Sequence, residues 1–134
     1  MHMRRLDWIG ASRHGDGMNR FPRLIAPLLW LTIIAVYFLS IMPPDDAPRL
    51  ASDKVEHMTA FLTLTIMASL GFPKLSPGLI GAGLAAFGAF IEFSQMLPII
   101  HRDASALDWL ADLCAIAFGL LVITPFRLRA RDAG

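Results

Sequence analysis

Eight side chains suited to acid–base chemistry or ligand binding stand in two short stretches of an otherwise apolar chain. The first stretch, SDKVEH at residues 52–57, carries Asp53, Lys54 and His57. The second stretch, IEFSQMLPIIHRDASALDWLAD at residues 91–112, supplies the other five: Glu92, Gln95, Arg102, Asp108 and Asp112. A histidine with carboxylic acids suits proton transfer, and Lys and Arg bind anionic groups. We therefore interpret the two stretches as parts of one candidate site.

These residue types fit three kinds of chemistry. In the first, His57 or Glu92 is a general base and another carboxyl group, such as that of Asp112, is the acid. In the second, a divalent cation is the cofactor, and one histidine with several carboxylates favours Mg²⁺ or Mn²⁺ over structural zinc. The ligands of that cation would be Asp53, His57, Glu92 and Asp112. In the third, Arg102 and Lys54 hold an anionic headgroup, pyrophosphate or peptide carboxylate without a reaction.

The elements that position these groups follow from the composition. Of the 134 residues, 55% are hydrophobic and 17% are charged, with a mean hydropathy of +0.55. Several apolar stretches approach the ~20 residues that cross a bilayer core, so we predict an integral membrane protein. The single cysteine, Cys114, excludes a disulfide within the chain. The basic residues are spread over segment ends and form no patch for nucleic acid.

Four apolar runs of helical length divide the chain, at residues 24–42, 57–72, 75–97 and 107–126. Backbone groups in lipid must be hydrogen-bonded within their own segment, so we predict four transmembrane helices. The sequence lacks the alternation typical of a membrane barrel. A flexible basic leader, residues 1–23, is expected before this membrane domain of residues 24–126, and a short basic tail, residues 127–134, after it.

The distribution of Lys and Arg predicts the orientation of these helices. Nine of these residues lie in the leader, the connection after the second run and the tail, and three lie in the other two connections. Basic residues are retained on the cytoplasmic side. We therefore expect both termini, the leader and the tail in the cytoplasm and the candidate site at the outer leaflet.

The carboxyl groups on either side of the third connection are predicted at matching depths. Glu92 lies about five residues before the expected end of its helix, and Asp112 about five after the expected start of the next. At a rise of ~1.5 Å per residue, both would lie ~7–8 Å inside their helix ends. Asp53 and His57, like Asp108 and Asp112, are four residues apart and share a helix face. We expect polar groups of three helices to meet at one level.

Small residues continue the same helix faces toward the cytoplasmic side. On the third helix they are Gly81, Ala85 and Gly88, and on the fourth they are Ala115 and Gly119. Small residues let membrane helices approach closely. The predicted fold is an all-α bundle of four transmembrane helices with a small cavity that opens outward.

The order of these motifs resembles the VanZ-like family, small bacterial membrane proteins named after an accessory factor of glycopeptide-resistance clusters. The matching segments are DKVEHMTAF at residues 53–61, EFSQ at 92–95 and RDASALDWLAD at 102–112, with Gly119 beyond them. The family pattern is D-K-x-x-H, E-x-x-Q, an Arg and D-x-x-x-N, and the resemblance covers about residues 28–125. Asp112 stands where the pattern has Asn, and Ala115 where Gly is common, so the site is more acidic here.

The resemblance implies a multi-pass protein of the bacterial cytoplasmic membrane with a role in the cell envelope and a link to teicoplanin resistance. It supplies no settled reaction. The expected ligand is a cell-surface or lipid-linked molecule. The candidate catalytic residues are His57, Glu92 and Asp112, and the candidate ligand-binding residues are Asp53, Lys54, Gln95, Arg102 and Asp108.

The competing hypothesis is a non-enzymatic binding or structural protein whose polar cluster holds the helices together. In it, Asp108 caps its helix, Lys54 pairs with Asp53 or Glu56, and Asp112 packs against Lys54 or Arg102. A proton-linked transporter or a channel is disfavoured, because the cytoplasmic halves of the four segments lack polar residues that would complete a pathway.

Overall fold

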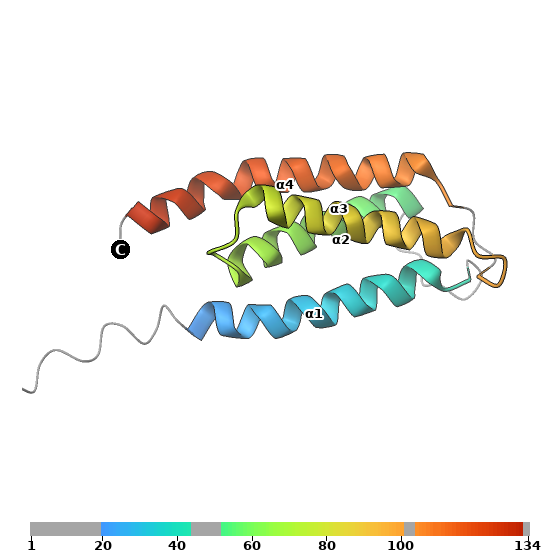
Figure 1. Ribbon diagram of the computed structural model, residues 1–134, viewed down its shortest axis with the longest axis horizontal. Helices are drawn as coiled ribbons and strands as arrows, with labels where there is room; N and C mark the ends of the chain where they lie inside the picture. The colour runs from blue at the N-terminus through green and yellow to red at the C-terminus, as the bar shows by residue number, and fades with distance from the viewer. Residues whose placement is uncertain (1–19, 44–51, 101–103, 133–134) are drawn as a thin grey trace, which may run out of the picture.

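The computed structural model describes residues 20–43, 52–100 and 104–132, and all regular structure in these residues is helical. The four helices are α1 (Arg20–Ile41), α2 (Asp53–Gly71), α3 (Pro77–Gln95) and α4 (Ala106–Asp132). They run alternately in opposite directions (Figure 1). The ends of α1 and α3 lie with the starts of α2 and α4 at what we call the α3–α4 end. The α2–α3 connection, the start of α1 and the end of α4 lie at the α2–α3 end.

Local sequence explains where α2 and α3 begin. α2 starts after Ser52, and its first turn carries Asp53 and Glu56, which are favourable near the positive end of the helix dipole. At the start of α3, the Ser76 hydroxyl accepts a hydrogen bond from the Leu79 N–H at 3.2 Å, and Pro77 stands in the first turn. Serine at the N-cap and proline at the first helical position are both favoured there.

The end of α4 and the start of α1 differ from those predicted. α4 continues through Pro125 to Asp132, so most of the expected tail extends the helix. The loss of one N–H at the proline is offset by the good helix formers Leu128, Arg129 and Ala130 that follow. α1 begins at Arg20, inside the expected leader, and residues 1–19 of that leader lie outside the described residues.

α2 is the central helix of the bundle. It contacts α1, α3 and α4, as α3 contacts its three neighbours, but the contacts of α2 with α4 and α1 are the most extensive in the bundle. Its side chains Phe61 and Leu64 are fully buried, at 0% exposure. They form the core with Leu29 of α1, Ile80, Leu84 and Ile91 of α3, and Ala115 and Ile116 of α4.

In the part of the chain that the structure describes, three helices are long and apolar enough to cross a membrane, over Leu24–Ile41, Pro77–Gln95 and Ala106–Arg129. α2, which was expected to be the second span, is less apolar because its first turns carry Asp53, Lys54, Glu56 and His57. Because the contacts of α2 with α1 and α4 are the most extensive in the bundle, its polar groups can face protein instead of lipid.

Glycines let α4 approach both of its neighbours. A methyl group at Gly119 of α4 would lie 2.9 Å from Cγ2 of Thr65 in α2, and one at Gly81 of α3 would lie 3.0 Å from Cδ1 of Leu120 in α4. Close approach at these small residues is therefore confirmed. The small residues predicted on α3 and α4 do not contact each other at these positions, because Gly119 faces α2 and Gly81 faces Leu120 of α4.

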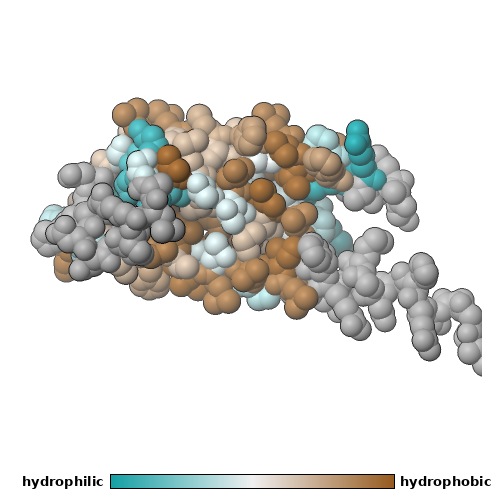
Figure 2. Space-filling view, turned by 180° about the vertical axis from the view of Figure 1, so that it is seen from behind, coloured by the Kyte–Doolittle hydropathy of each residue, from teal (hydrophilic) through white to brown (hydrophobic). Residues whose placement is uncertain are grey.

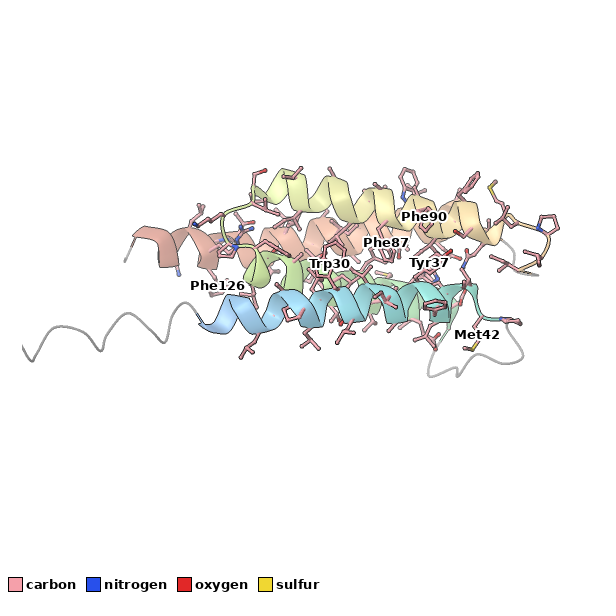
Figure 3. The ribbon with its side chains drawn as sticks, turned by 60° about the horizontal axis from the view of Figure 1, so that its bottom comes forward. Trp30, Tyr37, Met42, Phe87, Phe90 and Phe126 are labelled. Atoms are coloured by element: carbon pink, nitrogen blue, oxygen red, sulfur yellow. The ribbon has the colours of Figure 1, made fainter. Side chains whose placement is uncertain are left out.

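The outer surface is that of a membrane-like protein. Apolar side chains cover the middle of the face in Figure 2, and hydrophilic ones gather mainly toward its ends. α1 is exposed along its length, at Leu24, Leu28, Trp30, Leu31, Ile34, Phe38 and Leu39. It is held against α3 where Tyr37 stacks on Phe90, with ring centroids 5.4 Å apart (Figure 3). An apolar surface of this extent is unusual for a water-soluble monomer.

Candidate functional site

A histidine and a carboxylate from different helices form a buried pair near the α3–α4 end. Nδ1 of His57 in α2 lies 3.5 Å from Oδ2 of Asp112 in α4. The His57 side chain is 6% exposed and that of Asp112 is 1% exposed. We call His57 and Asp112 the inner pair. It brings together two of the three predicted catalytic residues.

A second pair lies nearer the starts of the same two helices. Nζ of Lys54 is 3.8 Å from Oδ1 of Asp108, and these side chains are 50% and 17% exposed. We call Lys54 and Asp108 the outer pair. α2 and α4 run in the same direction (Figure 1), and each member of the outer pair precedes its inner counterpart by about one helical turn. The two pairs therefore stack along the α2–α4 contact, one exposed and one buried.

The competing hypothesis did not name these two contacts. Lys54 contacts Asp108 of α4, whereas that hypothesis named Asp53 or Glu56 of its own helix. Asp112 contacts His57, whereas that hypothesis named Lys54 or Arg102, and Arg102 lies outside the described residues. Asp108 does stand in the first turn of α4, as a capping role requires, but its carboxylate faces Lys54. The helix register along α2 and α4 decides these partners.

Glu92 links the end of α3 to the start of α4. Its Oε2 accepts a hydrogen bond of 2.7 Å from the Ser105 N–H, and the Ser105 carbonyl accepts bonds from the N–H groups of Asp108 and Trp109. Oε1 of Glu92 is buried and has no hydrogen-bond partner among the described residues. Oε2 of Glu92 thus stabilises the turn before α4, and Oε1 accepts no hydrogen bond from a described residue.

The predicted equal depth of Glu92 and Asp112 is wrong. α3 ends at Gln95, before the expected end at residue 97, so Glu92 stands in its last turn. Asp112 stands in the second turn of α4. The residue of α3 level with Asp112 is Gly88, where an added methyl group would lie 3.5 Å from Oδ2 of Asp112. Glu92 is therefore nearer the end of the bundle than the inner pair.

Gly88 and Trp109 form the wall of the inner pair on the α3 side. A methyl group at Gly88 would lie 3.2 Å from Cδ1 of Trp109 and 3.3 Å from Cζ of Phe61. The indole N–H of Trp109 donates to the Ala85 carbonyl at 3.1 Å. This bond fixes the ring against the small-residue face of α3, and the absence of a side chain at Gly88 leaves room for the Asp112 carboxylate.

Gln95 has a structural contact. Its Nε2 donates to the Ser40 carbonyl at 2.9 Å, and the side chain is buried. Beside it, the Ser94 hydroxyl lies 3.3 Å from the Tyr37 hydroxyl. The end of α3 is thus tied to α1 by Gln95 and Ser94. The prediction that Gln95 binds a ligand is untested, but its amide already has a partner within the protein.

The polar atoms of the inner pair lack good hydrogen bonds. Neither carboxylate oxygen of Asp112 has a hydrogen-bond partner among the described residues, and Nδ1 of His57 has none either. Their 3.5 Å contact lies beyond the usual range of 2.7–3.2 Å for a hydrogen bond from nitrogen to oxygen. Buried polar groups in native proteins are nearly always paired, and an unpaired one costs free energy. An unpaired buried group in a native structure calls for an explanation, and a catalytic or ligand-binding role is one.

The predicted metal-binding set is not assembled. Within residues 20–43, 52–100 and 104–132, no three side chains of His, Cys, Asp or Glu lie together in positions that would hold an ion. Asp53, His57, Glu92 and Asp112 therefore do not form one ligand cluster. Asp53 is the first residue of α2, and Glu92 is turned toward Ser105. Arg102 lies outside the described residues.

Three contributors to the site were not predicted: Ser105, Gly88 as the neighbour of Asp112, and Trp109 as a hydrogen-bond donor. A signal existed for Ser105, because SALD at residues 105–108 fits the S-x-x-D pattern of a helix start. Gly88 had been assigned only to helix packing. Which side chain it faces depends on the rotation of α4 about its axis, which no sequence spacing specifies.

Comparison of the chain with protein-family models, curated proteins and solved structures finds no match. The interpretation of the site therefore depends on the residues and their geometry.

Proposed function

We propose that this chain is a VanZ-like protein of a bacterial cytoplasmic membrane whose four helices all span the bilayer. The inner pair, His57 and Asp112, is the centre of an outward-facing site that recognises a cell-surface or lipid-linked molecule. The observation that carries the proposal is the buried contact between these two side chains, whose facing atoms have no hydrogen bond within residues 20–43, 52–100 and 104–132. A contact selected only to join helices would be expected to satisfy those atoms.

Charge at the two ends supports the orientation in this proposal. Lys74, Arg127 and Arg129 belong to the α2–α3 end, and the positive-inside rule assigns such an end to the cytoplasm. The opposite end then faces outward and carries the outer and inner pairs. A ligand from the outer leaflet reaches the inner pair past Lys54, which attracts an anionic group.

The inner pair has the arrangement of a base with an orienting carboxylate. Because Nδ1 of His57 faces Asp112, the ring presents its other nitrogen, Nε2, to a ligand. A carboxylate that holds an imidazole in one orientation is the arrangement used in nucleophilic and general-base catalysis. The site thus suits proton transfer to or from the bound molecule as well as recognition, with Asp112 as the positioning residue.

The alternative function is structural, and two contacts favour it. The carboxylate of Glu92 accepts a hydrogen bond from the Ser105 N–H, and the amide of Gln95 donates one to the Ser40 carbonyl. Both side chains join elements of the bundle, as a polar cluster that stabilises membrane helices would do. The proposal assigns a joining role to these two residues and a ligand-binding role to the inner pair.

The deciding experiment replaces His57 by Gln, which keeps a polar side chain of similar length and removes the imidazole. Cells expressing the variant are compared with wild type for membrane abundance of the protein and for glycopeptide susceptibility. We expect normal abundance and loss of the resistance effect. The matched control is Lys54→Gln, which alters the exposed outer pair and should change resistance less. If abundance and resistance fall together for His57→Gln, the structural alternative is correct.

The orientation has its own test. Reporter fusions after residue 49 and after residue 131 should give an external and a cytoplasmic signal, respectively. A cytoplasmic signal at residue 49 would exclude an outward-facing inner pair.

A further inference from the structure

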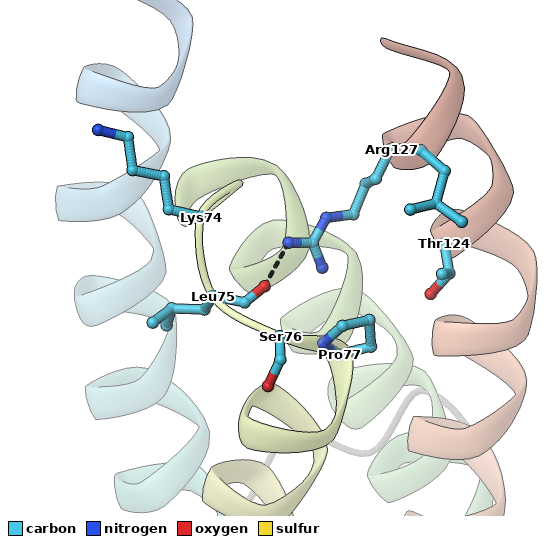
Figure 4. Close-up of a pocket in the computed structure, with 7 residues that line it drawn as sticks. Lys74, Leu75, Ser76, Pro77, Thr124 and Arg127 are labelled. Carbon is cyan, nitrogen blue, oxygen red and sulfur yellow. Dashed lines mark hydrogen bonds between the residues drawn. The ribbon is translucent and has the colours of Figure 1, made fainter. Parts of the chain in front are cut away.

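A cavity of about 190 Å³ lies at the α2–α3 end, away from the inner pair. It is bounded by the α2–α3 connection and the start of α3, at residues 74–77, and by Thr124, Arg127 and Leu128 of α4 (Figure 4). A water molecule takes up about 30 Å³ in the liquid, so the cavity has room for a group of several heavy atoms.

Arg127 is held in a defined position at this cavity. Its Nη2 donates to the carbonyl oxygens of Leu75 at 2.7 Å, Pro73 at 3.0 Å and Phe72 at 3.4 Å. The guanidinium group is charged at any physiological pH. Figure 4 shows the group lying over the connection, between Leu75 and α4. A cation is thus pre-positioned at the cavity by backbone contacts.

The remaining lining suits a molecule with a polar head and an apolar part. Ser76 and Thr124 contribute hydroxyl groups, and Leu75, Pro77 and Leu128 contribute apolar surface. Lys74 also lines the cavity. In Figure 4 the ammonium group of Lys74 lies on the α1 side of the connection. Because the side chain is exposed and flexible, the ammonium group can rotate toward a bound anion.

The position of the cavity along the helices indicates where its ligand comes from. The apolar segment of α3 begins at Pro77 and that of α4 ends at Arg129, and both boundaries adjoin the cavity. If these helices cross a bilayer, the cavity lies at the level where apolar tails give way to polar headgroups. Ligands at this level are chiefly lipid headgroups, which carry phosphate.

We infer that this cavity binds a phosphate-bearing anion, supplied as the headgroup of an anionic phospholipid. The positive charge of the Arg127 guanidinium group, held at the cavity by the carbonyls of the α2–α3 connection, attracts the phosphate. Thr124 and Ser76 donate hydroxyl hydrogen bonds to the same phosphate, and the apolar lining contacts the glycerol part. This site is separate from the proposed function of the inner pair and does not depend on it.

The test titrates purified full-length protein in detergent micelles with phosphatidylglycerol and, separately, with phosphatidylcholine. Retained lipid is counted by native mass spectrometry, and the thermal unfolding midpoint is recorded. We expect phosphatidylglycerol to be retained and to raise the midpoint, and phosphatidylcholine to do neither. Micelles exclude the long-range surface potential of a charged bilayer, so only local contacts contribute. Equal retention of the two lipids would overturn the inference.

Variants test the cavity itself. Thr124→Phe fills it without a change of charge, and Arg127→Lys keeps the charge without the fork geometry. Each should weaken phosphatidylglycerol binding about tenfold, the size expected for one lost charge-assisted contact. The control is Arg129→Gln, two residues further along α4 and not part of the lining, which should bind as wild type does. If Arg127→Lys fails to fold, Thr124→Phe carries the test. An equal loss in Arg129→Gln would show nonspecific attraction and overturn the inference.

A last arm separates a lipid from a soluble ligand. Glycerol phosphate and inorganic phosphate are added in place of lipid, with the unfolding midpoint as the readout. Neither should raise the midpoint at concentrations where phosphatidylglycerol does, because they lack contact with the apolar lining. Stabilisation by either one at those concentrations would overturn the assignment to a lipid.

Discussion

The two ends of the bundle use their charged side chains in different ways. At the α3–α4 end, the carboxylate of Asp112 faces His57 and has no hydrogen bond among the described residues. At the α2–α3 end, Arg127 donates to three backbone carbonyls of one connection. A charge bound to backbone stabilises a turn and hence the fold. A buried carboxylate without such bonds costs free energy, and the proposed function gives Asp112 a role that offsets this cost.

The largest expected effect concerns Arg127. Arg127→Ala removes hydrogen bonds to the carbonyls of the α2–α3 connection, and bonds from a charged donor contribute about 1.5–3 kcal/mol each. Because these bonds share one donor atom and one connection, we expect a total loss of about 3 kcal/mol in the free energy of unfolding. Denaturant titration of the purified protein in detergent measures it. Arg129→Ala, at an exposed position of the same helix, is the control and should unfold as wild type does.

The second prediction concerns the opposite end. Asp112→Asn keeps the shape of the side chain and removes its charge. Because the carboxylate has no good hydrogen bond to lose, the free energy of unfolding should stay within about 1 kcal/mol of wild type or rise. The same titration measures it, with Asp108→Asn as the matched control. A loss as large as that of Arg127→Ala would show that the two ends do not differ in this way.

The smallest effect concerns the outer pair. A double-mutant cycle with Lys54→Ala and Asp108→Ala should give a coupling energy of about 0.5 kcal/mol, because exposed ion pairs contribute little. The coupling should shrink further in high salt. The coupling energy is calculated from the unfolding free energies of the wild type, the two single variants and the double variant. A coupling of several kcal/mol would indicate that the outer pair, and not only packing, joins α2 to α4.

Much of the fold could be predicted from the sequence, because apolar runs bounded by Ser, Pro and Gly specify helices locally. Each helix was predicted to within a few residues, except for the end of α4, where Leu128, Arg129 and Ala130 continue the helix. The less apolar character of α2 was visible in its first turns, but its central position was not. Contacts with three neighbours depend on how the helices are arranged, and hydropathy does not report that arrangement.

The candidate site was predicted in part. The sequence placed its carboxylates near one end of the bundle and on the right helix faces, since periods of three and four residues are local properties. The sequence did not predict that Glu92 contacts Ser105. It also predicted that Glu92 lies level with Asp112, whereas Gly88 occupies that level. The end of α3 lies two residues before its predicted position and the start of α4 one residue before, and these shifts account for most of the difference.

By itself, the sequence determined that this protein is helical and membrane-like, and that its polar side chains gather at the ends of apolar helices, because composition and period govern both. Only the tertiary structure decided which polar groups meet. His57 faces Asp112, and Lys54 faces Asp108, because the close approach of Thr65 to Gly119 sets the register of α2 against α4. Packing between helices selects one rotation and one register among many that the same pattern permits, and the inner pair is a consequence of that selection.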